Sequence, residues 1–313
     1  MATRPSARAN SRTWRGLATY AGSSASTRAV TTGSSYPPDA SRTTTWTAHC
    51  RNCAVSAVSP ACVVATRHGA HTAGSTATGS FDDLEAVSSI CDQHGVWLHV
   101  DAAHGGTALL SSRHRQRLRG IDRARSVAWD PHKMLLIPSQ AGMLLVRDER
   151  DLDAAFSQRA PYLFQTSNTE RTWDQGTRSF MCSRRADVLK VWVALQRYGS
   201  EALGEMHDYF CDLTRQFYEE IAERPDFVAM HEPESNILCF RYVGDGSHSD
   251  EELDRLNRDL RERYNLSGEG WITGTNLDGR RVLRVTIMNP RTTPTDLRDV
   301  LDGLAAVGQT LSS

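Results

Sequence analysis

The hydrophobic positions at the start of the chain follow no regular period. Before Cys62 the sequence is rich in Ser, Thr, Ala and Arg. Neither a helical period of about 3.6 nor a strand period of about 2 is sustained there. Because such a stretch offers little apolar surface to bury, we expect residues 1–59 to be irregular, disordered or aberrant in origin. An Arg-rich, acid-poor composition also occurs in organellar targeting peptides, but this segment is long and has no clear amphipathic helix.

Short apolar runs begin near residue 60 and alternate with loops and helical patterns. Several lack polar alternation, which is typical of strands covered on both faces; they are ACVVAT (61–66), VWLHVDA (96–102), SVAW (126–129) and GMLLVRD (142–148). Strands that alternate with helices predict an α/β fold with a mainly parallel sheet flanked by helices. We assign residues 60–223 to a partial large domain of this kind and the helices that follow it.

One helix of this domain has clear limits. Asp82 and Asp83 are placed to open it, and Gly95 is placed to end it. Its apolar face is predicted to carry Leu84, Val87, Ile90 and Cys91. The preceding loop is rich in Gly, Ser and Thr, and we expect RHGAH (67–71) to interrupt the passage from the first strand into that loop.

The second half of the chain predicts helices and then a small α+β domain. Residues 150–223 are mainly helical in pattern, with Val188, Val191, Trp192 and Leu195 at helical spacing. We assign residues 224–313 to the small domain, with strands around 236–243 and 281–289, a helix over 250–264 between them, and a final helix over 297–311.

Composition is that of an ordinary globular enzyme. The 313 residues carry a net charge of -1 and are 39% hydrophobic, and no apolar run is long enough to cross a bilayer. We therefore expect neither a nucleic-acid nor a membrane partner. The seven cysteines are scattered, which suits a reducing cytoplasm. His49 to Cys53 contains a CxxC pair, but no second pair follows at zinc spacing, so we predict no metal site.

Lysine is scarce enough for its positions to be informative. Of 36 basic residues only Lys133 and Lys190 are lysines. Lys190 belongs to an amphipathic helical pattern and reads as a surface charge, whereas Lys133 follows a strand end. An amine can form a Schiff base with an aldehyde and a guanidinium cannot. Asp101 ends a neighbouring strand, and a carboxylate there could keep a pyridine nitrogen protonated.

These residues belong to a larger pattern that resembles the pyridoxal-phosphate-dependent amino acid decarboxylases of group II. The matching pieces occur in the family's order over roughly residues 60–311, namely GSTATGSFDDLE, WLHVDAAHGG, RSVAWDPHKML, YLFQ and LRVTIMNPRTT. YLFQ and the following RSFMCSRRADVLKVW look closer to the glutamate and cysteine sulfinate branch than to the aromatic one. The resemblance implies a fold-type I enzyme that uses pyridoxal 5'-phosphate to decarboxylate an L-amino acid. An acidic one, such as glutamate, aspartate or cysteine sulfinate, is preferred.

The resemblance also implies a role for each matched residue. Lys133 would form the Schiff base and His132 would lie beside it. Asp101 would pair with the pyridinium nitrogen and Ala103 would pack against the ring. The remaining matched positions are Thr76 near the cofactor, Ser126 at its phosphate, and Arg284 at a substrate carboxylate.

The same resemblance implies features that this chain does not show. A phosphate-binding turn and a residue that stacks on the ring should precede the Gly-rich loop, and residues 1–60 offer neither. We therefore expect an N-terminally incomplete large domain, whose complete form would be a cytoplasmic homodimer. Two alternatives stay open: a catalytically inactive remnant, and another fold-type I enzyme such as an aminotransferase or a carbon–carbon lyase.

Overall fold

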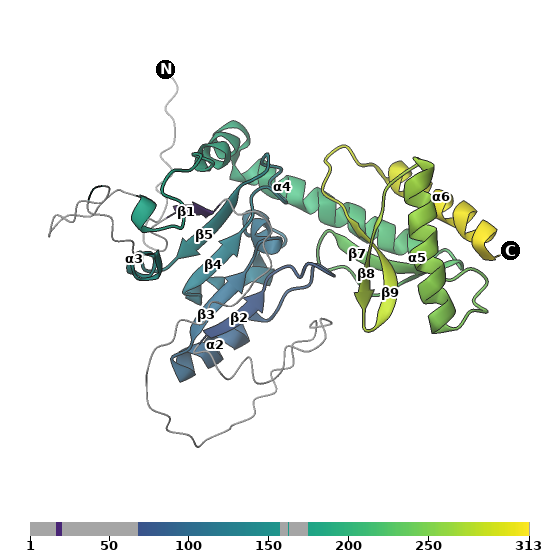
Figure 1. Cartoon of the computed structure of the whole chain (residues 1–313), viewed down its shortest axis with the longest axis horizontal. Helices are drawn as coiled ribbons and strands as arrows, with labels where there is room; N and C mark the ends of the chain where they lie inside the picture. The colour runs from purple at the N-terminus through teal and green to yellow at the C-terminus, as the bar shows by residue number, and fades with distance from the viewer. Residues whose placement is uncertain (1–16, 21–67, 157–161, 163–174, 313) are drawn as a thin grey trace.

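A long helix joins two units of the molecule, each built on its own sheet (Figure 1). The computed structural model describes residues 17–20, 68–156, 162 and 175–312. The predicted segment 1–59, the predicted strand 61–66, the pair Cys50 and Cys53, and most of YLFQ lie outside these ranges. Within them, no helix is long and apolar enough to cross a membrane.

The first unit is a five-stranded sheet in the order β1-β5-β4-β3-β2. Its strands are β1 (Leu17–Tyr20), β2 (His68–Thr72), β3 (Trp97–Asp101), β4 (Ser126–Trp129) and β5 (Gly142–Val146). Strands β2, β3 and β4 are parallel neighbours, with Thr72, Asp101 and Ala128 side by side across the sheet. The ends of β2 and β3 therefore meet at one edge, and the turn that follows β4 begins there.

The structure refines one expectation about this sheet and corrects another. Strand β5 runs antiparallel to β4, so the sheet that we predicted to be mainly parallel is mixed. The connection over residues 130–141 contains no helix, and a parallel return would need a longer crossover. RHGAH does not interrupt a strand either, since His68–Thr72 is itself β2 and pairs in register with β3.

Helix α2 (Leu84–His94) has the predicted ends. The Asp83 side chain accepts the amide of Ala86, and Gly95 ends the helix in the left-handed conformation, with φ of 60°. Leu84 and Cys91 are buried against the sheet, but Ile90 is half exposed. The remaining short helices of this unit are η1 (Gly105–Leu110), η2 (Arg115–Leu118), η3 (Ile121–Arg123), α3 (Arg150–Phe156) and η4 (Gln175–Thr177).

Helix α4 (Val188–Ala222) bridges the two units along the top of Figure 1. It is broken at Gly199, whose φ of 79° interrupts the helical backbone. Before the break, Val191 packs on the first unit while Trp192 is exposed, so the predicted apolar face is only partly buried.

The second unit is a four-stranded antiparallel sheet covered by helices. Its strands lie in the order β6-β7-β9-β8. The elements are β6 (Phe227–Ala229), β7 (Ile237–Tyr242), α5 (Asp250–Ser267), β8 (Thr273–Leu277), β9 (Arg280–Thr286) and α6 (Pro294–Ser312). Its core includes Leu213, Phe217 and Ile221 of α4 as well as residues of the strands and of α5 and α6. The boundary at residue 223 remains a prediction, and this core extends across it.

Polar contacts fasten the two units at the edge where β2 and β3 end. The imidazole of His104 lies 2.7 Å from the Asn236 side-chain oxygen. Asn236 donates its amide hydrogens toward Ile287 O and Met134 Sδ, so its oxygen accepts from His104 Nε2. Ser235 donates to the carbonyl of Gly79 at 3.0 Å.

Truncation of Phe240 should destabilise the second unit. The ring is fully buried and meets the ring of Phe217 edge-on at 5.5 Å. Phe240→Ala should lower the free energy of unfolding by about 3–5 kcal/mol, because it removes buried surface and leaves a cavity. Urea denaturation measures the change. The matched control Val228→Ala, on the neighbouring strand and 43% exposed, should cost less than about 1 kcal/mol. Equal losses in the two variants would contradict this placement of the core.

His104 should make the fold sensitive to acid. Burial lowers the pKa of His104 below its usual 6.5, so the folded chain holds the ring neutral while the unfolded chain takes up a proton. The free energy of unfolding should therefore fall as the pH drops through about 6.5 and below. His104→Gln keeps a donor for Asn236 without the titration, so its stability should fall less between pH 7.5 and 5.5. Chemical denaturation of both proteins at the two pH values measures the difference; the same loss in both would exclude this role.

Candidate active site

Asp101 lies at the carboxyl end of β3, in the middle of the parallel part of the sheet. Its backbone is fixed on both sides, because its carbonyl accepts from Ala73 and its residue pairs with Ala128 of β4. The side chain is exposed, and its oxygen accepts the amide of Ala103 at 3.0 Å. The carboxylate thus caps the following turn. It remains open to a ligand.

Lys133 follows β4 on a tight turn at the same edge. Its amide donates to the Asp130 carbonyl at 3.0 Å, and the amide of Asp130 donates to Ala103 O at 3.2 Å, which joins this turn to the end of β3. The Lys133 ammonium lies 3.0 Å from the Asp130 carboxylate, and the lysine side chain is 33% exposed. An ion pair this accessible to solvent stabilises a fold by about 0–1 kcal/mol, so the amine is readily released from it.

His132 is held in place by the start of β5. Its Nδ1 lies 2.8 Å from the carbonyl oxygen of Ala141 and 3.3 Å from the amide nitrogen of the same residue. Because the shorter contact is with an acceptor, we assign the proton to Nδ1, which leaves the lone pair on Nε2 in the neutral ring. The imidazole is half-buried next to Lys133 in the chain.

Glycines let three backbone segments close on one another around this edge. Gly74 adopts a φ of 90°, and a Cβ there would overlap the backbone of Gly105. A Cβ on Gly106 would meet the indole of Trp129, at the end of β4. The Gly-rich loop after β2, the turn after β3 and the end of β4 therefore form one close-packed platform.

Arg284 reaches the Gly-rich loop from the second unit. From β9 its Nη2 donates to the carbonyl of Thr76 at 2.6 Å, and its Nε donates to that of Ala77 at 3.1 Å. Burial lowers the pKa of this guanidinium from its ordinary value. The structure therefore brings Thr76 and Arg284 together, although the contact uses the Thr76 backbone.

His104 connects these groups electrostatically. The charges of Lys133 and Arg284 both lower its pKa, in addition to the larger effect of burial. His104 thus lies within electrostatic range of one cation from each unit. The sequence left this residue unassigned and did not identify its partner Asn236. The position of His104 directly after the strand end VDAA was the sequence signal that could have identified it.

Ser126 does not lie at the edge that carries Asp101 and Lys133. It begins β4, at the end of the strand opposite the Lys133 turn. Its buried hydroxyl lies 2.8 Å from His99 Nδ1 and accepts from Trp97 Nε1 at 2.9 Å. These contacts account for the hydroxyl within the described part of the chain. The predicted phosphate role of Ser126 therefore has no geometric support from the other site residues.

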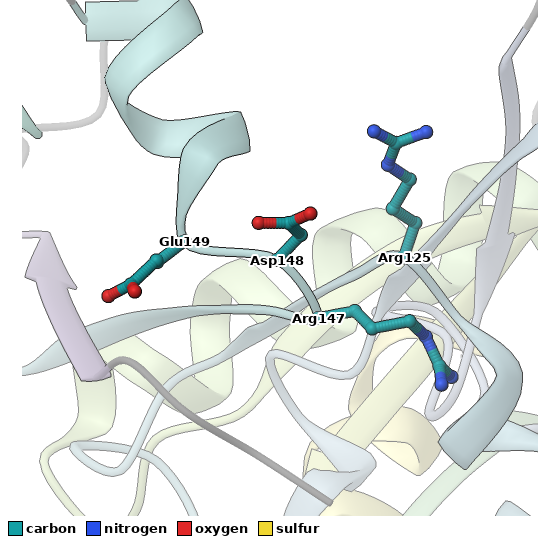
Figure 2. A pocket seen from close by; sticks show the side chains of 4 residues that line it. All are labelled: Arg125, Arg147, Asp148 and Glu149. Carbon is teal, nitrogen blue, oxygen red and sulfur yellow. The ribbon is translucent and has the colours of Figure 1, made fainter.

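A surface cavity of about 430 Å³ also lies at that opposite edge of the sheet. Figure 2 shows its lining side chains, with Arg125 before β4 and Arg147, Asp148 and Glu149 after β5. Asp151 already binds the Arg125 guanidinium at 2.6 Å, and Arg147 donates to Ala124 O. The cavity is therefore separate from the edge that carries Asp101 and Lys133.

The side chains at the edge that carries Asp101 and Lys133 suit two of the three polar groups of pyridoxal phosphate. The cofactor presents an aldehyde, a pyridine nitrogen and a phosphate. The Lys133 amine matches the aldehyde and the Asp101 carboxylate matches the nitrogen, and both groups are reached by solvent. Ala103, half-buried beside Asp101, is small enough to leave room for a ring. Thr76 and His132 lie on segments that border the same platform.

Comparison with known proteins agrees with this chemistry. The sequence family described as the pyridoxal-dependent decarboxylase conserved domain matches residues 52–243. An acidic amino acid decarboxylase (GADL1) of Bos taurus is 36% identical over 248 residues, covering 76% of this chain and 48% of that protein. The cysteine sulfinic acid decarboxylase of Rattus norvegicus is 38% identical, covering 77% of this chain and 51% of the relative. The chain spans about half the length of the curated relatives it matches.

Solved structures agree as well. The apo structure of mouse cysteine sulfinic acid decarboxylase (CSAD) superimposes with a TM-score of 0.70 at 33% identity, over 76% of this chain and 51% of that one. The expected fold class, that of fold-type I pyridoxal phosphate enzymes, is thereby confirmed. The chain belongs to the pyridoxal-dependent decarboxylase family, the carboxy-lyases that use pyridoxal phosphate.

Proposed function

We propose that this chain carries the lysine half of an amino acid decarboxylase site. The observation that supports this most is the placement of Asp101 and the Lys133 turn at one sheet edge, joined by the hydrogen bond from Asp130 to Ala103. When bound, pyridoxal phosphate supplies an electron-withdrawing ring that accepts the electrons left behind when an amino acid loses carbon dioxide.

The protein groups have separate tasks in this proposal. Lys133 would leave its ion pair with Asp130 and hold the cofactor at the aldehyde position through its amine. Asp101 would accept a hydrogen bond from the protonated ring nitrogen, and the Ala103 amide, which donates to the same carboxylate, fixes its orientation. His132, anchored through Nδ1, offers Nε2 as the atom that takes up or returns a proton.

Arg284 is proposed to receive a carboxylate of the substrate. Within the described part of the chain, Nε and Nη2 donate to the loop carbonyls of Ala77 and Thr76, which leaves Nη1 for a ligand. A guanidinium binds carboxylates by charge-assisted hydrogen bonds. Burial strengthens that attraction because less water screens it.

The preferred substrate is an acidic L-amino acid. The named relatives are an acidic amino acid decarboxylase and a cysteine sulfinic acid decarboxylase, and both kinds of name point to a substrate with a second acidic group. The positive charge of Arg284 near His104 favours such a substrate. A cytoplasmic homodimer remains part of the proposal.

Covalent attachment of the cofactor should depend on Lys133 alone. The chain, incubated with pyridoxal phosphate, should give a visible absorption band, and borohydride should then fix the label on the peptide containing Lys133. Lys133→Arg should abolish both signals, because a guanidinium does not condense with the aldehyde. Mass spectrometry after digestion locates the label.

The other lysine provides the matched control. Lys190→Arg keeps the charge beside Asp187 and should leave the label and the band unchanged. Labelling that survives in Lys133→Arg would contradict the assignment. A folded parent chain that takes up no cofactor at all would favour the inactive alternative.

Loss of Arg284 should loosen the Gly-rich loop. Arg284→Met removes both donors from the carbonyls of Thr76 and Ala77, so the amides of residues 74–80 should exchange with deuterium at least about fivefold faster, equivalent to about 1 kcal/mol. Hydrogen exchange read by mass spectrometry measures this. Arg280→Met on the same strand is the control, since its ion pair with Asp250 is exposed. Unchanged exchange in Arg284→Met would exclude the contact.

A further inference from the structure

A buried group of possible metal ligands lies between α4 and the segment that follows η1, outside the Lys133 site. His114, His207 and Cys211 place their ligand atoms within 4.8 Å of one another. The side chain of His207 is 3% exposed and Cys211 is 7% exposed. Asp208 lies beside this group, with its carboxylate 3.8 Å from His114 Nε2 and 3.7 Å from His207 Nδ1.

The fold positions these four side chains from two segments that are far apart in sequence. His207 and Cys211 are four residues apart on α4, so they share a helix face. Gly204, one turn earlier, lets α4 approach the carbonyl of Leu110, where a Cβ would overlap it. Ser111 then accepts the amides of Arg113 and His114 and donates to Asp208, which holds the His114 turn against the helix.

The separations suit a shared cation better than hydrogen bonds. At 3.7 and 3.8 Å, the two contacts of the Asp208 carboxylate with imidazole nitrogens are too long for hydrogen bonds. Among the residues that the structure describes, the buried His114 Nε2 has no hydrogen-bond partner. The Cys211 sulfur lies 3.8 Å from His207 Nδ1. Ligand atoms around a tetrahedral zinc ion lie about 3.3–3.8 Å apart, given bond lengths of about 2.0–2.3 Å.

We propose that His114, His207 and Cys211, with Asp208 as the fourth ligand, form a binding site for one divalent transition-metal ion, with zinc as the ion that the nitrogen, sulfur and oxygen donors fit best. A zinc ion accepts all three donor types and tetrahedral geometry. Small movements of the four side chains would bring them into bonding range.

The local charges permit such an ion. The carboxylate of Asp208 places a negative charge next to both imidazoles. The nearby Arg113 is already matched by Asp212 through contacts of 2.8 and 2.6 Å. As zinc binds, a bond forms between the metal and the Cys211 sulfur, and the thiol proton passes to solvent.

A bound ion would stiffen the platform beside the candidate active site. The His114 turn follows η1, which itself follows the Asp101–His104 segment, and α4 joins the two units. Cross-linking the turn to α4 would therefore stabilise the contact between the units. The role is structural, because all four donors are supplied by protein side chains and the cluster is largely buried.

The test is metal binding by the full chain. Cobalt(II) replaces zinc as a spectroscopic probe, and one equivalent should produce tetrahedral d–d bands together with a sulfur-to-cobalt charge-transfer band. Zinc should raise the thermal unfolding midpoint. Cys211→Ser should remove the charge-transfer band, and both Cys211→Ser and His207→Ala should weaken binding by more than about tenfold.

Two control variants separate this site from other thiols. Cys239→Ser removes a buried cysteine of β7, and a Cys50→Ser/Cys53→Ser double variant removes the CxxC pair; both should bind cobalt as the parent does. X-ray absorption of the zinc-loaded parent chain should show one sulfur and three nitrogen or oxygen neighbours, a result that does not depend on any variant folding. Binding that survives in Cys211→Ser, binding lost with Cys50 and Cys53, or no binding to the folded parent would overturn the proposal.

Discussion

The in-register parallel pairing of β3 with β4 is the constraint on which the candidate site depends. It sets Asp101 beside Ala128, so the turns that follow both strands emerge at one edge. The hydrogen bond from the Asp130 amide to Ala103 then joins the two turns directly. A shift of one residue would turn the Asp101 side chain to the other face of the sheet, away from Ala103 and from any ring lying against it.

The second unit contributes side chains to this edge of the first sheet. Asn236 fixes the tautomer of His104, and Arg284 binds the backbone of the Gly-rich loop. The Arg284 guanidinium therefore lies within electrostatic range of His104, whose pKa the Lys133 charge also lowers. Two sheets with separate cores therefore contribute to one site, and α4, which packs into both cores, holds them in this relation.

Two groups of polar residues in this molecule suit different kinds of ligand. The exposed Asp101 and Lys133 are held by few contacts and are accessible to a small molecule. His114, His207 and Cys211 lie with their ligand atoms within 4.8 Å of one another, and His207 and Cys211 are buried from ligands of that size. Cysteine spacing alone predicted no metal site. The second group of residues is the reason that a metal site is proposed instead.

The sequence by itself determined the elements and the chemistry of the strand ends. Apolar runs predicted β3, β4 and β5, the acids and glycine around α2 predicted its limits, and the scarcity of lysine singled out Lys133. These features are local, since each depends on neighbouring residues and on backbone propensity. Only the tertiary structure decided the direction of β5, the position of Ser126 at the opposite edge, the backbone contacts of Arg284, and the meeting of His114 with Cys211. Each of these depends on which distant segments pack together, and the periodicity of a single chain does not encode that pairing.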